Sequence, residues 1–251
     1  MTDRPHSVIE SVTLPSIIHY ILENHRPCSM LVVCCSRKDF VDNVRDTVVK
    51  DSHDPNTANE SVESSAEMKD DSAFWLRPTL RTLAASRTLE LAFCPQLPVL
   101  RAFLATYPQY GTTDTRLDSV KSPSNHESRI LAILNPVEVH RQTTAFSTQG
   151  LNRTFAAAVE AADRSASRLI MAEIPFVLSQ GSTDEVMPPL DATATGISES
   201  DKNVWDEEIS ILNTTTKSFG AGERGWVGRT VAIRRVAGRW CEFARGSDLN
   251  S

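Results

Sequence analysis

The chain has 251 residues, a length that fits one α/β domain with room for insertions. Apolar residues make up 40% of it, enough for a sizeable core, yet no apolar run approaches the ~20 residues needed to cross a bilayer. The net charge is -6, and residues 51–72 alone hold seven acids against one base. The acidity therefore belongs to one segment and does not describe the folded surface.

Five cysteines, an odd number, occur without a C-x-x-C pair, at positions Cys28, Cys34, Cys35, Cys94 and Cys241. Cys34, Cys35 and Cys94 lie in or at the ends of strand-like runs, which is typical of buried thiols in a reducing compartment. The N-terminus lacks the apolar core of a secretion signal. We expect a protein of the nucleus or cytoplasm, with no membrane contact, no metal site and no cofactor.

Helical and strand-like segments alternate along most of the chain. Apolar residues at helical spacing predict helices, and short runs rich in branched apolar residues predict doubly covered strands. The expected helices are 15–25, 37–49, 76–86, 97–107 and 150–166, and the expected strands are 29–35, 88–93, 129–134 and 168–174.

Two polar segments interrupt this alternation. Residues 51–72 are poor in apolar side chains and rich in Ser, Asp and Glu, which predicts a disordered acidic insertion, with a docking tail or phosphorylation site as the alternative. Residues 111–127 predict a polar loop. The C-terminal part predicts antiparallel strands, including a hairpin that turns at Ala237 and Gly238. The expected fold is therefore a single α/β domain over 1–251, a three-layer structure with a largely parallel sheet and C-terminal antiparallel strands.

The segment from 129 to 175 carries the clearest resemblance. It reads LAILNP, then His140 and Arg141, then a long helix, then LIMAEIP, and WDEEISILN and TVAIRRVAGRWCEF follow. This order resembles the core of RecA-type recombinases and their eukaryotic paralogues over roughly residues 28–245. The resemblance implies a RecA-like fold, in which Glu173 lies in the region that faces nucleotide in an active member.

The residues that bind nucleotide in that family are missing here. A phosphate loop needs glycine amides and a Lys in the pattern G-x-x-x-x-G-K-[ST]. The strand at 29–35 is followed instead by Ser36, Arg37 and Lys38, and Asn135 stands where a carboxylate would orient Mg²⁺. We therefore expect a degenerate nucleotide site without catalytic residues, although Lys38 remains able to contact an anion.

A RecA-like core that has lost its nucleotide residues is similar to two groups of proteins. One is the recombinase-paralogue subunits of Shu-type complexes, which assist homologous recombination and DNA repair. The other is the RecA-like accessory ring of Elongator, which acts in tRNA wobble-uridine modification. Either resemblance implies a non-catalytic subunit whose partners are other RecA-like or recombinase-paralogue subunits. An ATP-binding enzyme with an unusual phosphate loop stays open as a third interpretation.

The C-terminal part is basic and contains two tryptophans. Arginines interleaved with aromatic residues can follow a nucleic-acid backbone, so DNA or RNA is a candidate partner. The alternative is that these arginines are solvated on an exposed strand edge. Trp226 is either a packing residue or an anchor for a partner. The candidate nucleic-acid-binding residues are Arg224, Arg229, Arg234, Arg235 and Arg239.

Two further residues near the predicted strand ends, His140 and Glu173, carry ionisable side chains that could be functional or structural. His140 is the only histidine beside the expected carboxyl edge of the sheet, with Ser36 and Ser147 as possible neighbours of a hydrolytic site. A structural histidine is the preferred interpretation, because no G-x-S-x-G elbow accompanies it. For Glu173 we expect an ion pair with a nearby arginine.

Overall fold

The computed structural model describes residues 6–24, 29–52, 79–107, 129–175, 203–211 and 229–246. Within them, six parallel strands form one sheet in the order β3-β2-β4-β5-β1-β8. Their bounds are β1 (Ser7–Glu10), β2 (Ser29–Val33), β3 (Leu89–Phe93), β4 (Arg129–Leu134), β5 (Ser167–Ala172) and β8 (Glu242–Arg245). Two short strands, β6 (Glu208–Ser210) and β7 (Thr230–Ala232), form a separate antiparallel pair. The predicted α/β fold with a largely parallel sheet is confirmed.

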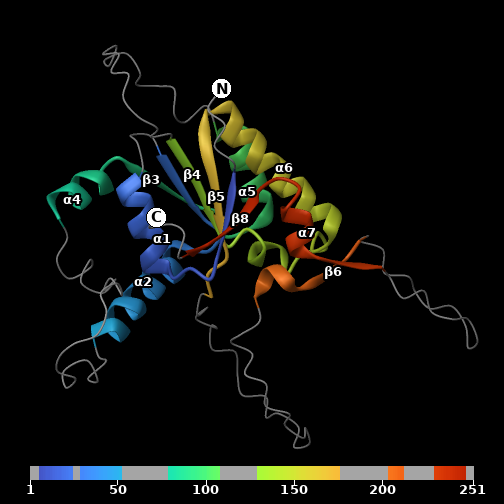
Figure 1. Cartoon of the computed structure of the whole chain (residues 1–251), viewed down its shortest axis with the longest axis horizontal. Helices are drawn as coiled ribbons and strands as arrows, with labels where there is room; N and C mark the ends of the chain where they lie inside the picture. The colour runs from blue at the N-terminus through green and yellow to red at the C-terminus, as the bar shows by residue number, and fades with distance from the viewer. Residues whose placement is uncertain are drawn as a thin grey trace, which may run out of the picture.

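Helices cover both faces of the sheet (Figure 1). One face carries α1 (Leu14–Asn24), α2 (Arg37–Ser52) and α4 (Leu80–Ser86). The other carries α5 (Leu97–Thr106), α6 (Thr148–Arg164) and α7 (Ile233–Ala237). Parallel strands need such crossover helices, and a right-handed crossover returns each helix to the sheet. The result is the three-layer arrangement that the sequence predicts.

The central strands are apolar on both faces, which is why they read as continuous hydrophobic runs. In β4, Ile130 and Ala132 belong to the cluster beneath α1, whereas Leu131 and Ile133 belong to the cluster beneath α6. This alternation follows from the two-residue repeat of a strand. Both faces must therefore be covered for the sheet to be stable.

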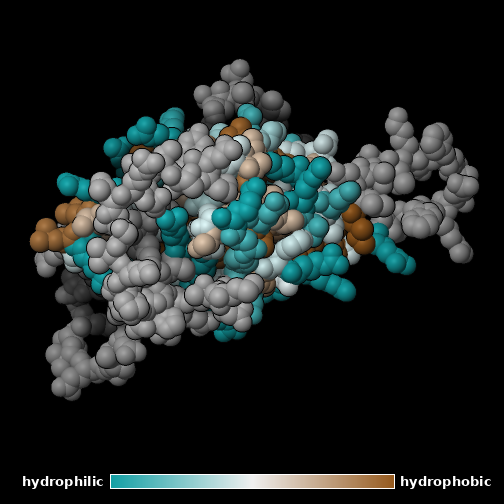
Figure 2. Space-filling model, turned by 90° about the horizontal axis from the view of Figure 1, so that it is seen from above, coloured by the Kyte–Doolittle hydropathy of each residue, from teal (hydrophilic) through white to brown (hydrophobic). Residues whose placement is uncertain are grey.

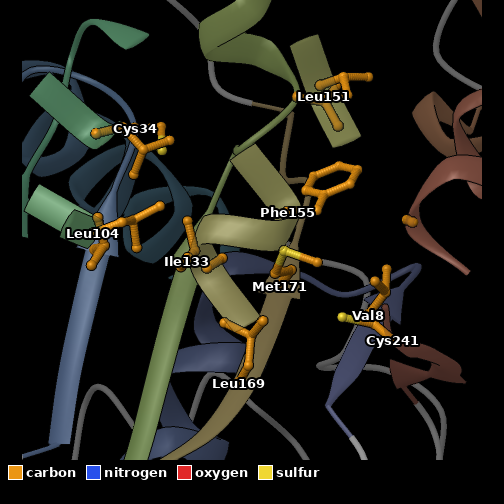
Figure 3. Close-up of a cluster of buried hydrophobic side chains, with 14 of the residues drawn as sticks. Val8, Cys34, Leu104, Ile133, Leu151, Phe155, Leu169, Met171 and Cys241 are labelled. Carbon is orange, nitrogen blue, oxygen red and sulfur yellow. The ribbon is translucent and has the colours of Figure 1, made fainter. Parts of the chain in front are cut away.

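The core on the α6 side gathers residues from distant parts of the chain. Figure 3 shows Phe155 of α6 directed toward the strands, near Met171 of β5. Trp205, from the short 3-10 helix η5 (Val204–Asp206), is also fully buried in this core. Its ring centroid lies 5.6 Å from that of Phe243 in β8 and 6.5 Å from that of Phe155. Trp205 thus fixes the C-terminal segment onto α6 and the sheet.

Two expectations for the chain ends differ from the structure. The strand β1 is not among the predicted elements, although it lies between β5 and β8. The predicted hairpin at Ala237 and Gly238 is wrong, because a short helix, α7, occupies 233–237 and β8 then joins the main sheet parallel to β1. The helix forms because Ile233, Val236 and Ala237 share one buried face.

Several predicted segments fall outside the described residues. The acidic insertion at 51–72 lies there except for its first two residues, which end α2, and the polar loop at 111–127 lies there entirely. That residues 1–251 form a single domain stays a prediction. In the part of the chain that the structure describes, no helix is long and apolar enough to cross a membrane.

Candidate functional site at the carboxyl edge of the sheet

Because all six strands of the main sheet are parallel, their carboxyl ends meet at one edge. Ligands of open α/β sheets bind in the crevice outside these ends. We use the term carboxyl edge for the residues that follow the strand ends and the side chains that contact them. The strands end there at Glu10, Val33, Phe93, Leu134, Ala172 and Arg245.

The chain passes from a strand into a helix four times at this edge. The connections after β1, β2 and β3 are residues 11–13, 34–36 and 94–96, and the connection after β4 is 135–147. None of these four connections contains a glycine. A loop that wraps phosphates needs glycines, because its backbone amides must point at the anion without side chains in the way. The described carboxyl edge therefore offers no phosphate loop.

The predicted degenerate phosphate site begins α2. The hydroxyl of Ser36 accepts from the amide of Asp39 at 3.1 Å and donates to its carboxylate at 2.6 Å. Ser36 is therefore a helix cap. The carboxylate of Asp39 occupies the helix N-terminus, where a phosphate would otherwise be attracted. Arg37 and Lys38 are exposed in the first turn.

Asn135 joins the tips of two neighbouring strands. Its side-chain amide donates to the carbonyl of Ile174 at 2.9 Å, and its side-chain oxygen accepts from the Ile174 amide at 2.6 Å. The residue is buried and has a φ of 59°, a backbone conformation that asparagine tolerates better than most residues. Asn135 thus extends the pairing of β4 with β5 by one residue, and its polar atoms are occupied.

A short segment from η5 crosses the carboxyl edge near β1. Glu10, the last residue of β1, accepts two hydrogen bonds from the guanidinium of Arg234, one of them at 3.0 Å, and a third from Asn203 at 3.0 Å. Arg234 also donates to Asp206 at 2.9 Å and stacks on the ring of Phe243, 4.7 Å from its centroid. We call these four charged and polar residues, Glu10, Asn203, Asp206 and Arg234, the β1 clamp.

The connection after β4 is tied to the same segment. Arg141 makes two hydrogen bonds to the carboxylate of Glu207, at 3.0 and 2.7 Å, and a third to Glu138 at 2.6 Å. Such a two-pronged contact fixes orientation as well as charge. Arg141 is the loop arginine of the RecA-type resemblance, and here it holds 203–207 against the β4 end of the edge.

Glu173, just after β5, is the least ordinary ionisable group at this edge. Burial raises its pKa to about 8, and the repulsion of Glu138 adds to this rise. The Val137 amide, which donates to the Glu173 carboxylate at 2.5 Å, and the positive charge of Arg141 lower the pKa in part. The residue as a whole remains partly accessible to solvent. No arginine donates a hydrogen bond to it among the residues described, so the expected arginine pair is not found.

His140 is a structural residue. Its Nδ1 lies 3.2 Å from the carbonyl of Ala145 and its Nε2 lies 3.0 Å from the hydroxyl of Thr154. Because a carbonyl only accepts, Nδ1 carries the proton. Burial lowers the pKa of His140 to about 4, so the ring is neutral at pH 7. Ser147 instead caps α6 by accepting from the amide of Gly150 at 3.2 Å, so the two do not form a nucleophile–base pair.

The structure divides the predicted nucleic-acid-binding arginines. Arg234 is occupied in the β1 clamp, whereas Arg229, Arg235 and Arg239 are exposed. Arg224 and Trp226 lie outside the described residues. Across the ranges given above, no group of three His, Cys, Asp or Glu residues is placed to hold a metal ion. Cys34, Cys35 and Cys94 are buried, as expected, and burial raises the pKa of each thiol.

Sequence reasoning missed the partners that fill the edge: Glu10, Asp206 and Glu207. Each is an acid without a distinguishing motif, and its arginine lies far away in the chain, 66 residues in the case of Arg141 and Glu207. No periodicity or spacing marks such a pair. A bidentate contact of this kind becomes visible only when the fold brings both ends together.

We predict that Asn135→Asp lowers the free energy of unfolding by about 2–4 kcal/mol at neutral pH, because a buried carboxylate would face the Ile174 carbonyl without a proton to donate. Gln149→Glu, the same amide-to-acid change on the exposed start of α6, is the control and should change it by less than about 0.5 kcal/mol. Urea unfolding measures both. Equal stability of Asn135→Asp and the wild type would contradict the role given to Asn135.

The β1 clamp predicts unequal effects of two neighbouring arginines. Arg234→Ala leaves the mostly buried carboxylate of Glu10 without its main partner and should cost about 1–3 kcal/mol of unfolding free energy, since solvent screens part of the contact. Arg235→Ala removes an exposed side chain and should cost less than about 0.5 kcal/mol. Thermal unfolding in low salt separates them, and equal losses would argue against the clamp.

Glu173 predicts a pH dependence of stability. Its pKa is about 8 in the folded chain and near 4.5 when unfolded, so its contribution is complete below pH 4.5 and is lost as the pH rises through 8. Between pH 6.5 and 8.5, Glu173→Gln should remove a decline of about 1–2 kcal/mol, and because both proteins contain His140, its own titration cancels in the comparison. Exposed Glu242→Gln is the control. Parallel pH profiles of Glu173→Gln and the wild type would contradict this assignment.

A scan of the sequence against protein-family models finds no match, and a search of curated proteins finds none either.

Proposed function

We propose that this protein is a non-catalytic, RecA-like subunit of a multi-protein complex that assists homologous recombination and DNA repair. The observation that carries the proposal is the state of the carboxyl edge. Four glycine-free connections, the paired Asn135 and the β1 clamp occupy the region where an active member of the family would hold its nucleotide. A parallel α/β core that lacks a nucleotide site is better suited to binding a partner protein than to hydrolysing ATP.

The chemistry of the edge supports a binding role over a catalytic one. Two of its arginines are already paired within the chain, because Arg141 faces Glu138 and Glu207, while Arg234 faces Glu10 and Asp206. Each guanidinium already donates three hydrogen bonds to carboxylates of the chain, which a triphosphate would have to displace. The neutral His140 is fully buried and hydrogen-bonded through both ring nitrogens, so it is out of reach of a substrate.

Affinity purification of the full chain from its native cell, with mass spectrometry of the bound proteins, tests the proposal. We expect recombinase-paralogue subunits among the partners. A hexameric ring or tRNA in the purified material would instead favour the Elongator-type role. A monomer without any partner would contradict both.

Titration with labelled ATP and Mg²⁺ distinguishes the remaining enzyme interpretation. We expect no saturable binding below about 1 mM, equivalent to less than about 4 kcal/mol of binding free energy. Micromolar binding that Lys38→Ala abolishes would overturn the pseudo-ATPase proposal and revive an unusual phosphate loop. Lys38 is exposed, so its removal should not unfold the chain.

A further inference from the structure

The two edges of the main sheet differ in how they are protected. At one edge, β8 is four residues long and exposes a charged residue at each end, Glu242 and Arg245. At the other, β3 is five residues long, contains neither proline nor lysine, and pairs with β2 along its whole length. No described strand pairs with the outer side of β3. Natural proteins seldom leave a long apolar edge strand in this state.

Apolar side chains are exposed along the same flank. Leu91, in the middle of β3, has 51% of its surface exposed, and α4, which leads into β3, exposes Leu80 and Leu83. Figure 2 shows hydrophobic atoms at the left end of the molecule, the side on which α4 lies in Figure 1. An exposed apolar edge strand beside exposed leucines is typical of an interaction surface.

The sequence of β3 suits pairing with itself. Leu89 and Phe93 pack toward the α1 side of the sheet and Ala92 toward the α6 side, so alternation places Leu91 with Leu89 and Phe93. In an antiparallel pair centred on Leu91, Leu91 meets its own copy and Leu89 meets Phe93. Glu90, the one charged side chain of β3, then faces Ala92 and not a second Glu90. No like charges oppose each other in this register.

We propose that the outer edge of β3 is a homodimer interface, at which a second copy of this chain adds its own β3 in antiparallel orientation about a two-fold axis through Leu91. The contact would join two six-stranded sheets into one and would cover both copies of Leu91. Such an interface is isologous, since the same residues contribute from both sides. The inference does not depend on the proposed role in recombination.

Sedimentation of the full chain over a concentration series tests the dimer. We expect the wild type to dimerise reversibly and Leu91→Lys to raise the dissociation constant about tenfold or more, because two lysines would meet at the axis. Ile211→Lys is the control: Ile211 is also an exposed apolar residue, but it follows β6, away from β3, and its change should leave dimerisation unaltered. Unchanged thermal unfolding would show that Leu91→Lys is folded.

Crosslinking tests the register independently. Cysteines directly opposite in an antiparallel pair lie within disulfide reach, so Leu91→Cys should give a covalent dimer under mild oxidation. Ile211→Cys should not. The proposal is overturned by a wild-type monomer throughout the series, by dimerisation that Leu91→Lys leaves intact, or by the absence of the Leu91→Cys crosslink. If the protein is a monomer and the β3 amides still resist hydrogen exchange, another segment of the same chain covers the outer edge of β3.

Discussion

The contact between Glu10 and Arg234 is the constraint on which the placement of the C-terminal segment, 203–246, depends. It joins the end of β1 to α7, and Asp206 and the ring of Phe243 hold the same guanidinium. Trp205, buried between α6 and β8, anchors the segment that supplies Asp206. The Glu10 carboxylate is mostly buried and needs such partners, because it would be costly there without them.

The same contacts determine what the carboxyl edge can do. Segment 203–207 reaches β1 through Asn203, α7 through Asp206 and the β4 connection through Glu207. Gly246, after β8, adds to this closure, since a Cβ at that position would lie 3.0 Å from the Ser11 carbonyl, directly after β1. In an active α/β enzyme this region is left open for a ligand. Here the chain fills it with its own side chains.

Local pattern accounts for the predictions that succeeded. The predicted strands corresponding to β2, β4 and β5 and the predicted helices corresponding to α1, α5 and α6 are all present. A strand buried on both faces is a continuous apolar run, and a helix buried on one side has apolar residues at helical spacing, so both can be recognised from the sequence. The absence of glycine directly after β2 was also readable. Asn135 was singled out as the position of a missing carboxylate, which stays a prediction. Its hydrogen-bond partner, Ile174, was not foreseeable, since a side-chain bond to the backbone beyond another strand leaves no spacing signal.

By itself, the sequence determined the three-layer α/β class and the lack of a phosphate loop, since both follow from which residues are adjacent in the chain. Tertiary structure alone decided that β1 is a strand, because a four-residue segment with only two buried apolar residues, Val8 and Ile9, gains its stability from β5 and β8 on either side. It also decided that 233–245 forms a helix and a parallel strand and not a hairpin. The physical reason is that Ile233, Val236 and Phe243 find their apolar partners in α6 and Trp205, residues too distant in sequence for any local pattern to reveal.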